Sequence, residues 1–152
     1  MKKSIVVRPL PLIINLLISL GGGTLIGLLT SKNNIAENYV APSFQPPAWV
    51  FIAVWTILYT LMAISFTRVM SNDDAKKIYY LQLVLNFLWP ILFFKFELLT
   101  LSFIWIILLI VAVIIMIITF YKEDKLAGLL QIPYLIWLLV AAALNLGYVL
   151  LN

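Results

Sequence analysis

The sequence predicts an all-α membrane protein, folded as a single bundle of five transmembrane helices. Hydrophobic residues make up 64% of the chain and charged residues only 11%. Soluble domains are about half apolar and about one quarter charged, so this chain carries too few charges to keep a globule of its size in solution. The charges also fall between long apolar runs rather than within them, which is the pattern of a multi-pass protein.

Five apolar runs account for nearly the whole chain, which we treat as one transmembrane domain over residues 1–152. Each is close to the roughly 17 to 25 residues that a helix needs to cross the hydrocarbon core. The first run is too long for the core of a typical cleaved signal peptide. None of the runs alternates as a membrane β-strand does. The expected helices are about 9–30, 47–68, 77–96, 98–121 and 126–150.

Basic residues are divided unequally between the two ends of these helices. Five spans place the termini on opposite sides, and positive charge collects on the cytoplasmic side. We therefore predict a protein of the cell membrane with a cytoplasmic N-terminus, an external C-terminus and an external loop over residues 32–46. The N-terminal side holds Lys2, Lys3, Arg8, Arg68, Lys76, Lys77, Lys122 and Lys125, and the other side holds only Lys32 and Lys95.

Several chemistries are excluded by residues that the chain lacks. Without cysteine or histidine, it forms no disulfide, no Cys/His zinc site and no Ser-His-Asp triad. No ionisable side chain lies deep in a predicted span, which argues against proton relays and charged ion pathways. The net charge of +4 sits at helix ends rather than in a nucleic-acid-binding patch. We expect no metal, no catalytic residue and no nucleic-acid partner.

Three of the five runs carry aromatic and amide residues at helical spacing. Residues three and four apart share a helix face, and an amide that faced lipid would cost free energy. These faces should point into the bundle, where aromatic walls with a few amides suit a flat, mostly apolar ligand. The alternative is ordinary packing, with amides linking helices and tryptophans at the membrane interface. The faces comprise Phe51, Trp55, Tyr59, Met62 and Phe66; Gln82, Asn86, Trp89 and Phe93; and Trp137, Ala141, Asn145 and Tyr148.

The first and fourth runs are less specific. Glycines at positions 21, 22, 23 and 27 of the first run allow another helix to approach closely. The fourth run is almost uniformly aliphatic, and we expect it to face lipid or a partner subunit.

Three blocks resemble the tryptophan-rich sensory protein and translocator protein family, also called the peripheral-type benzodiazepine receptor family. They are QPPAWVFIAVWTILY at 45–59, QLVLNFLWP at 82–90 followed by Phe93-Phe94, and PYLIW at 133–137 followed by Leu144-Asn145. The resemblance implies a five-helix bundle, often a homodimer, whose pocket binds porphyrins and in many members sterols and synthetic benzodiazepine-type ligands. The implied lining is Trp55, Tyr59, Asn86, Trp89, Phe93, Trp137 and Ala141, with Pro47, Trp49 and Phe51 near the mouth. To these we add Gln82 and Asn145, the other two amides that helical spacing places on inward faces.

The chain departs from the family pattern at four places. An acidic residue that is common in the family's fourth helix has no counterpart here. A tryptophan–tyrosine pair that the family carries early in the first loop is replaced by Ile35 and Ala36. A Gly-Pro pair in the second helix is replaced by Ile52 and Ala53. Tyr148 is followed by no basic residue, so the sterol-recognition pattern is absent.

We therefore predict an integral membrane receptor for porphyrins and similar flat hydrophobic ligands, with a role in sensing or transport. It needs no cofactor and takes porphyrin as its ligand. Two alternatives stay open. One is a light-dependent porphyrin-degrading enzyme, against which the missing aromatic pair argues. The other is a non-catalytic structural membrane protein with a lipid-filled pocket.

Overall fold

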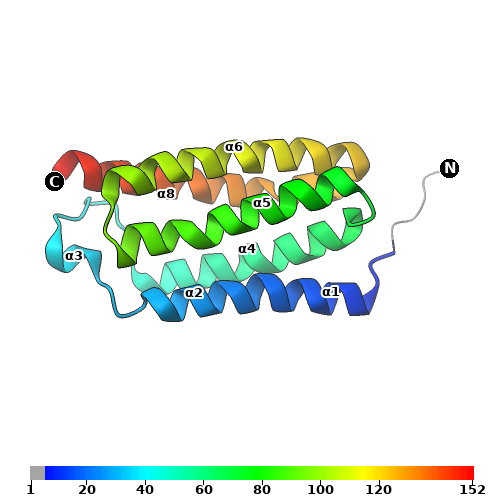
Figure 1. Ribbon diagram of the computed structural model, residues 1–152, viewed down its shortest axis with the longest axis horizontal. Coiled ribbons are helices and arrows are strands. Elements are labelled where there is room, and N and C mark those ends of the chain that lie inside the picture. Colours follow the sequence, from blue (N-terminus) through cyan, green and yellow to red (C-terminus); the bar gives the residue numbers. More distant parts are fainter. Residues whose placement is uncertain (1–5) are drawn as a thin grey trace.

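The computed structural model describes residues 6–152, which form a bundle of long helices (Figure 1). Two of these helices contain a turn of π-helix, labelled η1 and η2. The elements are α1 (Pro9–Leu16), η1 (Leu17–Gly21), α2 (Gly22–Thr30), α3 (Ile35–Asn38), α4 (Ala48–Val69), α5 (Asp73–Pro90), η2 (Ile91–Lys95), α6 (Leu99–Glu123), α7 (Lys125–Leu129) and α8 (Ile132–Leu151).

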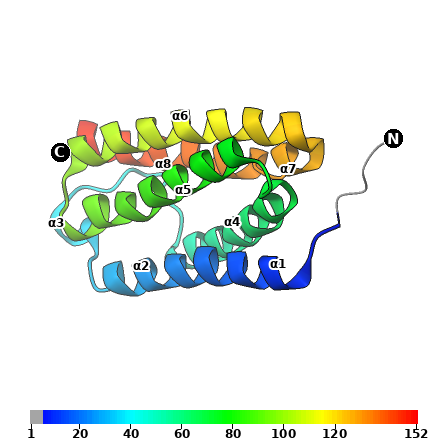
Figure 2. The same ribbon diagram turned by 45° about the vertical axis from the view of Figure 1, so that its right-hand side comes forward.

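Five helices in the described chain are long and apolar enough to cross a membrane, which confirms the predicted fold class. The third of them begins at Asp73, before the predicted start at residue 77. The Asn72 side chain explains this earlier start, because it accepts a hydrogen bond from the Ala75 backbone N–H at 2.9 Å and so caps the first turn. The beginning of α1 and the end of α8 lie at opposite ends of the bundle (Figures 1 and 2), as five crossings require.

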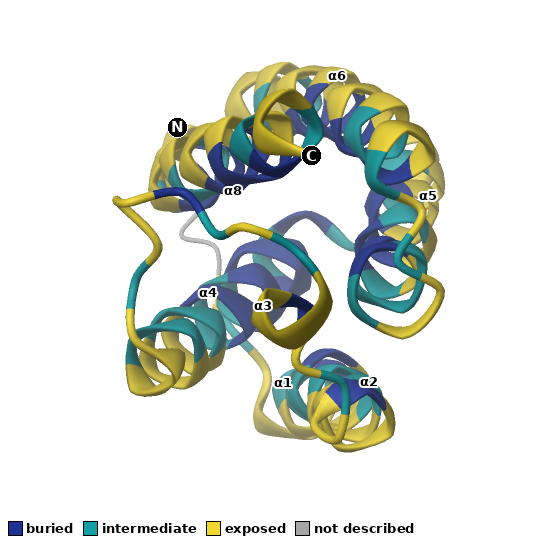
Figure 3. Ribbon diagram, turned by 90° about the vertical axis from the view of Figure 1, so that its left-hand side faces the viewer, coloured by how far each residue is buried: buried dark blue, intermediate teal, exposed yellow. Residues whose placement is uncertain are grey.

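The long helices pack in a ring. α1 packs against α4, α2 against α5, α5 against α6 and α6 against α8, and α4 contacts α7. Seen from the end that carries α3, inward faces are mostly buried and outward faces mostly exposed (Figure 3). Many outward side chains are large and apolar, such as Leu17, Ile57 and Ile104. Such a surface suits lipid, because lipid tails are as apolar as these side chains.

α6 has a buried face as well as a lipid-facing one. Ile106, Leu109, Val113 and Met116 are buried, and α6 packs against both α5 and α8. The sequence predicted contact with lipid or a partner subunit. It did not separate the two faces, because aliphatic side chains suit lipid and a membrane-protein core equally.

The 31–47 loop folds over one end of the bundle and carries α3. The Asn34 side chain accepts a hydrogen bond from the Ala36 backbone N–H at 3.2 Å, which caps α3. The Asn152 side chain holds the second half of the loop. Its oxygen accepts from the Val40 N–H at 2.8 Å, and its nitrogen donates to the Val40 carbonyl at 3.0 Å. The loop is therefore tied to the C-terminal end of α8.

Candidate ligand-binding site

A cavity of about 810 Å³ lies in the half of the bundle that the loop covers, and we call it the main cavity. Its volume lies within the range of about 300 to 1,000 Å³ that is typical of small-molecule sites. Within residues 6–152, no charged side chain lines it. The lining comprises Leu20, Gly23, Thr24, Ile26, Gly27, Leu28, Thr30, Ser31, Asn33, Asn34, Ile35, Gln45, Pro46, Ala48, Phe51, Ile52, Trp55, Thr56, Tyr59, Trp89, Pro90, Phe93, Phe94, Leu144 and Tyr148.

Two stacked aromatic pairs contribute to the wall of the main cavity. Trp55 and Tyr59 of α4 have ring centroids 5.3 Å apart at an interplanar angle of 27°. Trp89 of α5 and Phe93 of η2 have centroids 5.2 Å apart at 10°. Each pair joins residues four apart, which lie above one another on a helix face. These rings are the groups that a flat aromatic ligand would contact, because aromatic rings favour stacked and edge-on arrangements.

A chain of hydrogen bonds holds the Tyr59 ring from behind. The Tyr59 hydroxyl donates to Asn86 Oδ1 at 2.6 Å, and Asn86 Nδ2 donates to the Tyr134 hydroxyl at 2.8 Å. The Tyr134 hydroxyl in turn donates to Gln82 Oε1 at 2.8 Å. All four side chains are buried, where hydrogen bonds offset the cost of removing polar groups from water. The network therefore links α4, α5 and α8 beside the cavity.

A second buried amide fixes the other aromatic pair. Trp89 Nε1 donates to Asn145 Oδ1 at 3.1 Å, and Asn145 Nδ2 donates to the Leu99 carbonyl at 2.9 Å. Asn145 thus joins α8 to the start of α6 and sets the orientation of the Trp89 indole. The wall is organised in advance of ligand binding, which lowers the ordering cost of binding.

Of the residues predicted to bind the ligand, five line the main cavity. These are Phe51, Trp55, Tyr59, Trp89 and Phe93. They come from α4, α5 and η2, which are distant in the sequence and brought together by the bundle. The helical spacing that placed them on inward faces therefore located much of one wall.

The other predicted residues lie elsewhere, and their part in binding stays a prediction. The amides Gln82, Asn86 and Asn145 do not line the cavity, because their hydrogen bonds to aromatic side chains place them behind its wall. Ala141 is buried in the helix packing of α8. Pro47 and Trp49 are exposed beside the mouth, and Trp49 is 69% exposed. Pro46 lines the cavity in place of Pro47.

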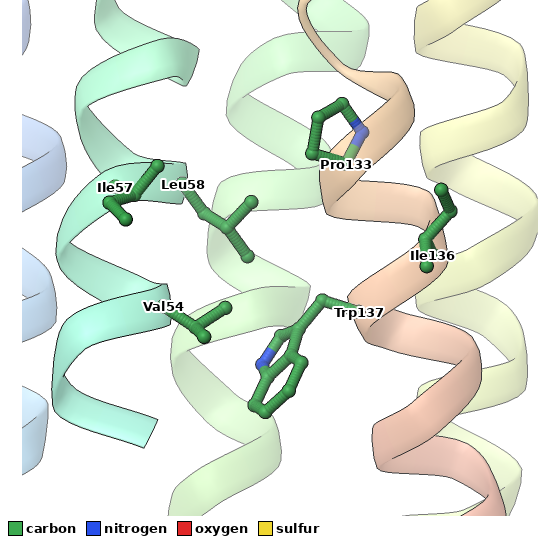
Figure 4. Close-up of a pocket in the computed structure, with 6 residues that line it drawn as sticks. All are labelled: Val54, Ile57, Leu58, Pro133, Ile136 and Trp137. Atoms are coloured by element: carbon green, nitrogen blue, oxygen red, sulfur yellow. The ribbon is translucent and has the colours of Figure 1, made fainter. Parts of the chain in front are cut away.

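Trp137 lies in a separate, smaller groove between α4 and α8 (Figure 4). The groove has a volume of about 280 Å³ and is lined by Val54, Ile57, Leu58, Pro133, Ile136 and Trp137. Trp137 packs edge-on against Phe51, with ring centroids 5.5 Å apart at 72°. Phe51 therefore separates this groove from the main cavity.

The largest contribution that sequence reasoning missed comes from α2 and the loop. Thr24, Gly27 and Leu28 form one wall, and Ile35 lies in the loop above the cavity. The glycines of the first run were interpreted as contacts between helices, which holds for Gly22 and Gly23 but not for Gly21 and Gly27. A glycine that is close to another helix and one that faces a cavity look alike in the sequence, because neither has a side chain to classify.

These features define an integral membrane protein with a preformed, aromatic, small-molecule-sized cavity. Residues 15–151 match the sequence model of the TspO/MBR family, and the chain belongs to this family. It is 43% identical over 116 residues to a "Tryptophan-rich protein TspO" of Archaeoglobus fulgidus, covering 73% of this chain and 75% of the relative. It is 37% identical to "Protein CrtK" of Rhodobacter capsulatus, covering 78% and 79%. It is 31% identical to a "Tryptophan-rich sensory protein" of Cereibacter sphaeroides, covering 93% and 91%.

Proposed function

We propose that this protein is a membrane receptor for porphyrins and similar flat hydrophobic molecules, with a role in sensing or transport. The observation that carries the proposal is the main cavity of about 810 Å³, with its two stacked aromatic pairs. Membership of a family with a member named a sensory protein supports a signalling role. The aromatic faces would stack on a macrocycle, and no acid–base pair or metal is needed for binding alone.

The two ends of the main cavity suit different parts of such a ligand. Asn33, Asn34 and Gln45 line the cavity at the loop end and offer neutral amide groups, whereas the Ser31 hydroxyl beside them donates to the Leu28 carbonyl and can only accept. The aromatic pairs lie deeper, along α4 and α5. A molecule with an apolar ring and polar groups at one edge would match this division, with its polar edge toward the loop.

We also propose the orientation with a cytoplasmic N-terminus and an external loop. Arg68, Lys76 and Lys122 lie near the ends of α4, α5 and α6 that are away from the loop, whereas Lys32 and Lys95 lie at the loop end. This division follows the positive-inside rule. Lys2 and Lys3, which the sequence prediction also used, lie outside the described residues. We also propose that a second copy of the chain is a partner. Native mass spectrometry of the protein released from lipid particles measures whether it is a monomer or a dimer.

Titration with protoporphyrin IX in lipid nanodiscs tests the receptor proposal. We expect saturable binding in the wild type and binding at least tenfold weaker in Trp55→Leu, a change of about 1.4 kcal/mol. Trp105→Leu is the matched control, since it makes the same change at a tryptophan that lies on α6, does not line the main cavity and donates to the Leu85 carbonyl. The control should bind as the wild type does. Absence of saturable binding, or equal affinities of all three proteins, would contradict the proposal.

A further inference from the structure

The first membrane helix leaves α4 as it approaches the loop. An added Cβ at Gly23 would lie 2.2 Å from the Tyr59 ring, so the two helices are in close contact there. One turn later, an added Cβ at Gly27 would meet no atom within 4 Å. α1 and η1 pack against α4, whereas α2 packs against α5 and η2. The space between α2 and α4 therefore widens toward the loop end, and α3 lies beyond the ends of both helices there (Figure 1).

The main cavity reaches the outer surface of the bundle through this widening. Leu28 of α2 and Ile52 of α4 both line the cavity, yet they are 67% and 71% exposed. Thr24 and Thr56 also line it and are exposed. A residue that lines a cavity and is also exposed lies on its rim. We call these four residues, two from each helix, the lateral rim.

The lateral rim is mainly apolar, with the Thr24 hydroxyl as its polar group, and lies on two helices that are long enough to span a membrane. Leu28 and Ile52 are aliphatic, and the Thr56 hydroxyl donates to the carbonyl of Ile52 in its own helix at 2.7 Å. That bond satisfies the hydroxyl, so Thr56 offers mainly its methyl group to the opening. Both helices are apolar enough to span a membrane, and from this we infer that the opening faces lipid.

The loop above the cavity is fastened at several points. Besides the two bonds between Val40 and Asn152, Asn38 Nδ2 donates to Glu97 Oε1 at 2.8 Å. The Tyr148 hydroxyl donates to Gln45 Oε1. Moving the loop away would break these contacts together. Ser31, Asn34, Gln45 and Ala48 also line the cavity and are exposed, so the cavity has an opening at the loop end as well. That opening is mainly polar, whereas the lateral rim is mainly apolar.

We propose that ligand enters and leaves the main cavity sideways from the bilayer, between α2 and α4, while the loop stays closed. This inference rests on the proposed receptor function and narrows its ligand class. The ligand is a molecule dissolved in the membrane, with a flat apolar ring that passes the lateral rim. Its polar groups lie along one edge and remain at headgroup depth, beside Ser31, Asn34 and Gln45.

Locking the loop tests the proposal, because the chain contains no cysteine and introduced pairs are unambiguous. A Cβ added at Gly147 would lie 3.1 Å from Pro42 Cβ, near the Cβ separation of about 3.5 to 4.5 Å in disulfides. Oxidised Pro42→Cys/Gly147→Cys therefore pins the loop to α8. Neither position lines the cavity. We expect protoporphyrin association and dissociation rates in nanodiscs to stay within about twofold of those of the reduced protein.

A second experiment closes the lateral rim and leaves the loop unchanged. Leu28→Cys/Ile52→Cys, bridged by a short bismaleimide, should slow association and dissociation at least tenfold relative to the same protein capped with a monofunctional maleimide. Thr56→Phe should slow exchange in the same direction without a bridge. Thr119→Phe is its matched control, since Thr119 also donates to the carbonyl four residues earlier, at 2.8 Å, but lies on α6.

The two possible failures are distinguishable. If the reduced and uncapped proteins show no saturable protoporphyrin binding, the receptor function fails and the lateral route with it. If they bind normally but the loop disulfide stops exchange while the bridged rim does not, only the lateral route is overturned. The lateral route is supported if ligand exchange is slow in the bridged-rim protein and in Thr56→Phe, and if exchange is unchanged in the protein whose loop is locked by the disulfide.

Discussion

The two ends of the bundle contain similar aromatic residues but pack them differently. Away from the loop, Phe66 of α4 stacks on Tyr79 of α5 with centroids 4.0 Å apart at 5°. Phe120 of α6 lies 6.4 Å from both rings. At the loop end, the stacked pairs Trp55–Tyr59 and Trp89–Phe93 each form along one continuous helix. Rings of different helices are stacked parallel at the end away from the loop. At the loop end the parallel stacks run along single helices, and rings of other helices meet them at an angle, as Tyr134 meets Trp55 and Tyr148 meets Phe93.

Small residues and polar links account for the tight end. Ala63, Ala75 and Ala127 are fully buried there, and small side chains let helices approach closely. Arg68 of α4 forms an ion pair with Asp124, the residue that caps α7. At the loop end, by contrast, α2 separates from α4 after Gly23. The difference between core and cavity therefore lies in the spacing of the helices, and substitutions at each end should separate stability from binding.

The largest difference is expected between two phenylalanines of α4. Phe66→Ala removes a buried ring from the three-helix stack and should cost about 3 to 5 kcal/mol of stability. Phe51→Ala should cost clearly less, because Phe51 is only partly buried and lines the main cavity, but it should weaken protoporphyrin binding. Unfolding in mixed detergent measures the first effect and titration the second. Equal stability losses would show that the two ends do not differ in packing.

The ion pair at the tight end should give the next largest effect. Asp124→Ala removes both the Arg68 partner and the α7 cap, a bond from the Leu126 N–H at 3.1 Å. We expect a loss of about 2 kcal/mol. Asp73→Ala removes an exposed pair with Lys76 and should cost less than about 1 kcal/mol. In the fraction of Asp124→Ala that is folded, ligand affinity should be unchanged. A loss of affinity would show that packing at the end away from the loop affects binding at the loop end.

Substitutions at two glycines of the first membrane helix test whether the ligand binds in the main cavity. Added Cβ atoms at Gly21 and at Gly27 meet no atom within 4 Å, but only Gly27 lines the main cavity. Gly27→Phe should therefore fill the cavity and weaken protoporphyrin binding at least tenfold, about 1.4 kcal/mol. Gly21→Phe should bind as the wild type does. Identical affinities of the two variants would place the ligand outside the main cavity.

The smallest expected effect is a gain of binding at the loop. Ile35 is buried and lines the cavity where the family pattern has an aromatic residue. Ile35→Trp should add a ring to the contact surface and tighten protoporphyrin binding by a few-fold, about 1 kcal/mol. The Ala36→Trp variant is the control, because Ala36 is exposed and does not line the cavity. Weaker binding of Ile35→Trp would indicate that the loop is too close to the ligand for a larger side chain.

The sequence predicted the five helices because charged residues or prolines separate the apolar runs. Helical spacing also placed Trp55, Tyr59 and Trp89 on inward faces, which they occupy. Helical spacing could not predict that Phe51 lines the cavity whereas Phe66 of the same helix is in the core, since this difference depends on how near the neighbouring helices lie. It also could not tell whether the Asn86 amide faces a ligand or a tyrosine hydroxyl on another helix. Both questions are settled by packing between helices rather than by position along one of them.

The most direct test of the account is an experimental structure of the protein in lipid with protoporphyrin IX bound. The account predicts density for the macrocycle inside the main cavity, in contact with the Trp55–Tyr59 and Trp89–Phe93 pairs, with its carboxylates toward Ser31 and the loop. Density in the groove beside Trp137, or on the outer surface of the bundle with the main cavity filled by lipid, would contradict it.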